Sequence, residues 1–166
     1  MLAKYSAGGV HVWSKRLGGS GGDFAHSVAS DPSGAVLVAG STFSPSIDMG
    51  GGPLSGLGEY DMVLAGYSSS GDHLWSKRLG GTGYDFAYSV ASDPLGAVLL
   101  AGYTQSDSID LGGGPLIGTP CCDMVLAKYA WDGTAPVSKL VALPVVSTVA
   151  GRLLGTATDT NAGVAG

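Results

Sequence analysis

The chain has 166 residues and a net charge of −5, and charged residues make up only 13% of its composition. This length suits one ordinary domain with a sizeable core. Glycine occurs 29 times, which favours many short strands and tight turns, because glycine enters positive φ without steric cost. The acidic balance and the scattered basic residues argue against a nucleic-acid ligand, since phosphate binding requires clustered Lys and Arg.

No apolar run approaches the roughly 18 residues that a membrane helix needs, so no transmembrane segment is expected. The N-terminus lacks the charged-then-apolar plan of a secretory signal, and the signal of an exported parent protein is expected to lie outside this chain. Only two cysteines occur, Cys121 and Cys122, and adjacent residues cannot join distant parts of a fold. We expect free thiols there rather than a strained vicinal disulfide.

A long internal repeat dominates the sequence. The segment from Trp13 to Leu54 recurs at an offset of 62, from Trp75 to Leu116, with 33 of 42 positions identical. The same offset extends to the first residues of the chain, which therefore starts inside a repeat. We expect tandem repeats over residues 1–140, with a truncated first copy and a partial third, and a degenerate repeat or poorly ordered tail over residues 141–166.

Two hairpins are predicted within one unit. Residues 24–30 and 35–39 flank Asp31 to Gly34, a good β-turn because proline presets φ at its second position and glycine suits its last. Residues 62–67 and 73–77 form the second hairpin, and Ile47 to Leu54 is expected to be a long connection between the two. Four short strands per unit are typical of a propeller blade.

Four motifs occur twice in register: WSKRLGG, the DFAxSVASDPxGAVLxAG hairpin, IDxGGGPL and DMVLAKY with its variant DMVLAGY. Together they resemble the bacterial seven-bladed β-propeller repeat (SBBP) family, in the glycine-rich style of large envelope or secreted proteins of myxobacteria-like organisms. The resemblance implies an extracellular or cell-envelope location, and it transfers no catalytic residue. The length holds about 2.7 units, so we predict an all-β fold of tandem four-stranded antiparallel blades, an incomplete propeller of about two to three blades.

Residues 18–26 can be laid over the nonapeptide that binds calcium in β-rolls, with Asp23 as the acidic member and Asp85 in the second copy. A β-roll requires nonapeptides that follow one another directly, whereas these copies lie 62 residues apart. We therefore favour turn-stabilising aspartates over calcium ligands. Asp48 and its counterpart Asp110, and the pair Asp61 and Asp123, are also assigned structural roles.

Other candidate sites have simpler explanations. Residues 18–22 fit G-x-S-x-G, but no strand-to-helix turn is predicted there, and the second copy does not repeat it. His26 corresponds to Tyr88, which favours an aromatic filler role, and we expect no metal site or cofactor. His73 and Trp75, two residues apart, are expected on one face of their strand. The pairs Lys15-Arg16 and Lys77-Arg78 are expected to be solvated strand ends, with an anionic partner as the alternative.

The sequence favours a non-catalytic binding or display scaffold of a larger envelope or extracellular protein. A protein or glycan would meet the loops in which the two copies differ, represented by Phe43, Ser46, Glu59, Tyr60, Gln105 and Ser108. The alternatives are a fragment of a propeller-borne polysaccharide lyase or glycosidase, and a gene remnant without independent function. An array of so few blades exposes apolar faces, so we also expect self-association or recruitment of additional blades.

Overall fold

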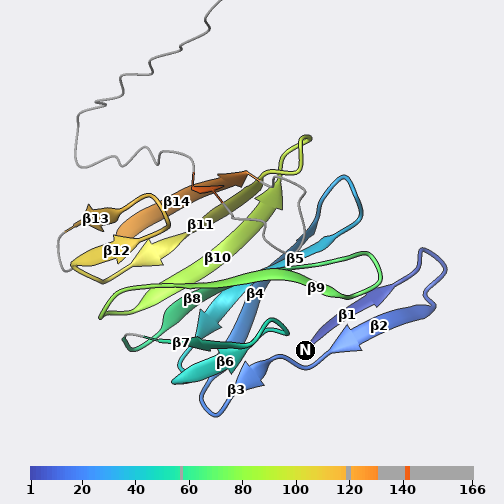
Figure 1. The fold of residues 1–166 in the computed structure, drawn as a ribbon, viewed down its shortest axis with the longest axis horizontal. Helices are drawn as coiled ribbons and strands as arrows, with labels where there is room; N and C mark the ends of the chain where they lie inside the picture. The colour runs from blue at the N-terminus through green and yellow to red at the C-terminus, as the bar shows by residue number, and fades with distance from the viewer. Residues whose placement is uncertain (57, 119–120, 131–140, 143–166) are drawn as a thin grey trace, which may run out of the picture.

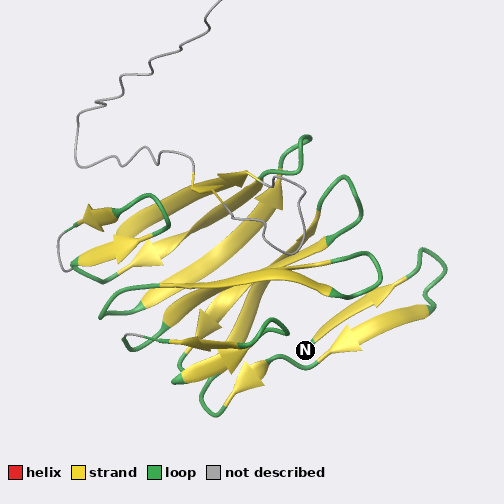
Figure 2. Ribbon diagram, in the orientation of Figure 1, coloured by secondary structure: helices red, strands yellow, loops and turns green. Residues whose placement is uncertain are grey.

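The computed structural model describes residues 1–56, 58–118, 121–130 and 141–142. These residues form 15 strands in antiparallel pairs, and the described part contains no helix (Figures 1 and 2). The predicted all-β class is therefore confirmed. Nor does the described part hold a helix of the length and hydropathy that a membrane crossing requires.

The first complete sheet, here called blade A, joins the two predicted hairpins in the order β4-β5-β8-β9. Its strands are β4 (Asp23–Ser30), β5 (Val36–Thr42), β8 (Asp61–Tyr67) and β9 (His73–Leu79). The turn between β4 and β5 forms as predicted, because Gly34 adopts a φ of 82° and Asp31 Oδ1 accepts hydrogen bonds from the backbone nitrogens of Ser33 and Ala35. Each strand is slightly longer than the sequence suggested.

The second sheet, blade B, repeats this order as β10-β11-β14-β15. Its strands are β10 (Asp85–Ser92), β11 (Val98–Thr104), β14 (Asp123–Ala130) and β15 (Val141–Ala142). Beside blade A lies a half-blade of β1 (Leu2–Tyr5) and β2 (His11–Lys15), which correspond in sequence to β8 and β9 (Figure 1). Of the tail expected over residues 141–166, only β15 lies within the described residues.

The long connection of each repeat is more ordered than predicted. In the first copy it forms a hairpin of β6 (Ser46–Asp48) and β7 (Pro53–Ser55), and β6 also pairs with β3 (Gly18–Gly19). In the second copy β12 (Ser108–Asp110) pairs with β13 (Pro115–Ile117). Buried Ile47 and Met49 anchor the first hairpin to the core. These apolar contacts hold the glycine-rich connection in one conformation.

Alternation along the strands gives blade A two apolar faces. Val36, Val38 and Val63 pack with Leu2 and Trp13 of the half-blade, in one buried cluster. The residues between them point to the other side and enter a second cluster shared with blade B. The members of this second cluster from β5 and β8 are Leu37, Ala39, Met62 and Leu64, and those from blade B include Val98, Leu100, Val125, Ala127 and Tyr129. Blades thus stack face to face, as the repeat predicted.

Strand irregularities correct one expectation. The pairing of β8 with β9 shifts register between Gly66 and Tyr67, and this bulge separates His73 from Trp75. His73 packs edge-on against Tyr67, with ring centroids 5.9 Å apart, whereas Trp75 belongs to the cluster shared with blade B. The two side chains therefore do not share a face, because the bulge breaks the simple two-residue alternation.

Candidate functional site

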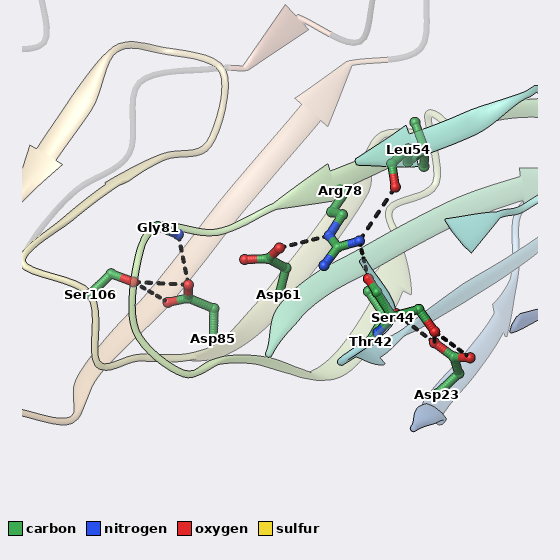
Figure 3. A network of polar contacts seen from close by, with 9 residues as sticks. All are labelled: Asp23, Thr42, Ser44, Leu54, Asp61, Arg78, Gly81, Asp85 and Ser106. Atoms are coloured by element: carbon green, nitrogen blue, oxygen red, sulfur yellow. Dashed lines mark hydrogen bonds and ion pairs between the residues drawn. The ribbon is translucent and has the colours of Figure 1, made fainter. Parts of the chain in front are cut away.

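An aspartate fixes the start of the first strand of each blade, and it is fully buried in blade B and partly buried in blade A (Figure 3). Asp85 accepts hydrogen bonds from the backbone nitrogen of Gly81 at 2.7 Å, from Ser106 Oγ at 2.9 Å and from Thr104 Oγ1. In blade A, Asp23 accepts the same set of bonds from Gly19, Ser44 and Thr42. The carboxylates thus tie the glycine-rich segment to the strand pair, which supports the structural role favoured over calcium ligation.

The basic residue at the end of β9 is buried, contrary to the expectation of a solvated strand end. Arg78 Nε donates to Asp61 Oδ2 at 2.7 Å, and only 5% of the arginine side chain is exposed. Its Nη1 donates to the carbonyl oxygens of Ser44, at 2.7 Å, and Leu54 (Figure 3). Arg78 therefore fastens the β6–β7 hairpin to blade A, whereas its counterpart Arg16 is exposed as expected.

The β6–β7 turn is held by Asp48, for which a structural role was predicted. Asp48 Oδ1 accepts bonds from the backbone nitrogens of Gly50 and Gly52, and Asp110 does the same in the second copy. Tyr67 donates from its hydroxyl to the carbonyl of Met49 at 2.7 Å. Burial, with a smaller contribution from Asp48, raises the pKa of Tyr67 to about 12, and burial likewise raises the pKa of Tyr129. The bonds to Asp48 and Asp110 hold turns, and the bond from Tyr67 joins the first of these turns to β8, which supports structural roles for these groups.

The remaining candidates of the sequence behave as ordinary side chains. Ser20, at the centre of G-x-S-x-G, is exposed in a bend between β3 and β4. His26 Nε2 hydrogen-bonds Ser41 Oγ at 3.0 Å, and its ring packs among aromatic rings as predicted. Cys121 and Cys122 are exposed free thiols, also as predicted. Within the described residues, no group of three or more His, Cys, Asp or Glu side chains is placed to hold a metal ion.

Only some of the loop residues predicted to bind a partner contact one another. The rings of Phe43 and Tyr60 lie with their centroids 5.1 Å apart, and Gln105 Nε2 donates to Cys122 Sγ at 3.3 Å. Ser46 and Ser108 are exposed residues of β6 and β12, and Glu59 is exposed in a bend. The structure therefore joins two of the predicted loop residues, Phe43 and Tyr60, in one apolar contact.

Around that contact lies a continuous set of rings, here called the aromatic surface. Its centre is Phe86, whose ring stacks with Tyr60 at 5.1 Å and with Tyr103 at 5.3 Å between centroids. The set comprises Phe24, His26, Phe43, Tyr60, Tyr84, Phe86, Tyr88 and Tyr103. It spans β4 of blade A and β10 of blade B, two strands that pack together.

Only two residues of the aromatic surface, Phe43 and Tyr60, were among the loop residues predicted from the sequence to contact a partner. A signal was present, because position 24 and its counterpart 86 are both phenylalanine, and positions 26 and 88 are both aromatic. Aromatic residues repeated two apart on a strand lie on one side of it, apart from local bulges. The repeat pattern could not predict the position of Tyr60. This residue comes from a loop, and its ring contacts Phe24 of blade A and Phe86 of blade B.

Two segments of the chain, residues 12–45 and 74–110, match the family model of a β-propeller repeat. No curated protein shows a significant match to the sequence. Each matched segment begins in the last strand of one sheet, β2 or β9, and continues through the first two strands of the next blade. The sequence repeat is thus out of phase with the blade, and each copy links two neighbouring sheets covalently.

Proposed function

We propose that this chain of β-propeller repeats is a non-catalytic binding scaffold, and that the aromatic surface contacts a protein partner. The observation that carries the proposal is a continuous set of eight rings, five of them exposed, on a platform of two packed blades. Phe24 and Tyr88 each remain 51% exposed, although their strands β4 and β10 pack together. Large exposed aromatic patches on folded proteins mark interaction sites.

Phe24 stays exposed although blade B packs against the same blade. Blade B covers the face of blade A so fully that Met62 and Leu64 are 0% exposed. Phe24 makes aromatic contacts with His26 and Tyr60 beside that same junction, yet half of its side chain is open to solvent. The Phe24 ring therefore lies at an edge that the junction with blade B leaves open, where a partner can reach it.

The geometry of the rings favours a protein over a glycan. Tyr84 and Phe86 are nearly parallel, with 5° between their planes, and Tyr60 is tilted by only 24° from both. Because these three rings stack against one another, their faces are not free to stack on a sugar ring. Ring edges and tyrosine hydroxyls remain available, and tyrosine-rich surfaces of this kind are enriched in protein interfaces.

The same proposal includes the location. We propose that the scaffold acts outside the cell or in the cell envelope. The support is that its glycine-rich motifs resemble those of envelope or secreted proteins with this type of repeat. Fractionation of cells that express the full-length parent protein tests it, because recovery only in the cytosol would contradict it.

The contact is tested by substitution of two exposed rings. The full chain would be immobilised to capture proteins from an extract of its source cells, and the affinity of each purified captured protein would then be measured by calorimetry. Tyr84→Ser with Tyr88→Ser is expected to weaken binding by about 30-fold or more, as loss of aromatic hot spots does. Leu95→Ser is the matched control, because Leu95 is 92% exposed on a turn away from the rings.

Two outcomes would refute the proposal. Equal affinity of the ring variant and the wild-type chain would show that the partner uses another surface. Binding of neutral polysaccharides, tested with xylan and dextran, that is lost in the same ring variant would show that the ligand is a glycan instead.

A further inference from the structure

The outer face of blade B is the exposed counterpart of a buried face. Met62 and Leu64 of β8 are 0% exposed, because blade B packs against them. Their counterparts one repeat later, Met124 and Leu126 of β14, are 89% and 57% exposed. The same side chains at equivalent positions of a strand thus differ only in whether a further blade covers them.

The half-blade presents the complementary face. Val125, Ala127 and Tyr129 of β14 are the buried residues that pack in one cluster with Met62 and Leu64. The offset of 62 makes Met1, Ala3 and Tyr5 of β1 their counterparts. All three are exposed, including 59% of the Tyr5 side chain, so β1 offers this docking face with no partner on it in the structure.

We propose that the exposed face of β14 in one copy of the chain docks onto the exposed face of β1 in a second copy. The contact would repeat the part of the internal junction in which residues of β8 and β14 share one buried cluster. Met124 and Leu126 of one copy would lie against Ala3 and Tyr5 of the next. The occupant is a second copy because the internal junction buries the same residue types in one cluster: Met124 and Leu126 repeat Met62 and Leu64, and Ala3 and Tyr5 repeat Ala127 and Tyr129.

A polar contact supports the same orientation. Lys4 of the half-blade donates from Nζ across the junction to the carbonyls of Gly34 and Ser69 in blade A, at 3.1 and 3.2 Å. Lys128 is the counterpart of Lys4, and Ala7 is the counterpart of Ser69. In the single chain Lys128 Nζ pairs with Asp93 Oδ2 at 2.7 Å, and in the proposed contact Lys128 of one copy would lie opposite the carbonyl of Ala7 in the second copy.

The interface is heterologous, which means that different surfaces of the two copies meet. At the internal junction the large side chains of Met62 and Leu64 pack in one cluster with the small Ala127 and Val125. If two β14 faces met instead, Met124 and Leu126 of one copy would lie against the same large side chains of the other, and the two Lys128 side chains would come close together. Self-association is therefore expected to be head to tail, with one free β1 face and one free β14 face left at the ends.

Complementary variants of the full chain test this arrangement. Leu126→Glu blocks only the β14 face and Ala3→Glu blocks only the β1 face, and both positions are exposed, so neither change disturbs the core. Light scattering coupled to size exclusion is expected to give a mass that rises with concentration for the wild type, and one chain for each variant. A mixture of the two variants restores one junction and is expected to give a mass of two chains and no more.

Leu95→Glu is the control and is expected to associate like the wild type. Circular dichroism checks that each variant is folded, and Met124→Lys with Tyr5→Lys serves as a second pair if one of the first does not fold. A wild-type chain that remains monomeric at every concentration would overturn the proposal. So would dimers formed by Ala3→Glu alone, which would show two β14 faces in contact, and so would a mixture that stays monomeric.

Discussion

Asp85→Ala is predicted to destabilise the protein strongly. The carboxylate is fully buried and accepts bonds from the backbone nitrogen of Gly81 and the hydroxyls of Thr104 and Ser106. A buried donor left without its partner costs about 1–3 kcal/mol. The two hydroxyls can rotate toward other acceptors but the backbone nitrogen cannot, so we expect the free energy of unfolding to fall by about 3–4 kcal/mol.

The first repeat supplies the matched control. Asp23 makes the equivalent hydrogen bonds at the start of β4 but is only partly buried, because no first strand of a preceding blade covers it in the described structure. Water can replace its carboxylate oxygens, so Asp23→Ala is expected to cost only about 1–2 kcal/mol. The difference between the two variants isolates the effect of burial, since the partners are the same residue types.

Urea denaturation followed by tryptophan fluorescence measures both variants. A shift of the midpoint without a change of slope would report stability alone. An equal cost for the two substitutions, or a greater cost at Asp23, would refute the reasoning, because burial would then not determine the value of these hydrogen bonds.

Two further predictions concern the backbone and the pH dependence. Gly102→Ala is expected to cost about 3 kcal/mol or more, because the new Cβ would lie 2.0 Å from a backbone carbonyl of β10, whereas Gly8→Ala, with only a hydroxyl at 3.9 Å, should change the urea midpoint little. Tyr67 has a pKa raised from 10.0 to about 12, so the folded protein keeps the phenol proton more tightly than the unfolded chain. Stability is therefore expected to be complete below pH 10 and to fall as the pH rises toward about 12. Urea midpoints across that range should decline less in Tyr67→Phe, and an identical decline would contradict the assignment.

The blade architecture could be predicted from the sequence because repetition and alternation are local signals. The offset of 62 fixed which residues occupy equivalent environments, and the turn from Asp31 to Gly34 placed the first hairpin. The hairpin that follows Ile47 was expected only as a connection, since its order depends on apolar contacts with the core and on the bonds donated by Arg78.

The errors have a common physical cause. Alternation predicts one face for His73 and Trp75, but a bulge changes that parity, and bulges leave no clear mark in the sequence. Arg78 looked like a solvated strand end because its partner, Asp61, is 17 positions away and comes near only through the pairing of β8 with β9. The aromatic surface was missed for the same reason, since Tyr60 joins it through tertiary contacts alone.

The phase of the repeat has a consequence for how such chains change in length. Each matched segment runs from the last strand of one sheet into the first two strands of the next, so it spans the junction between two sheets. Insertion or deletion of one whole unit would leave every surviving junction with its original pair of faces. Duplication or deletion of a repeat unit can therefore lengthen or shorten the array without any compensating substitution in the core.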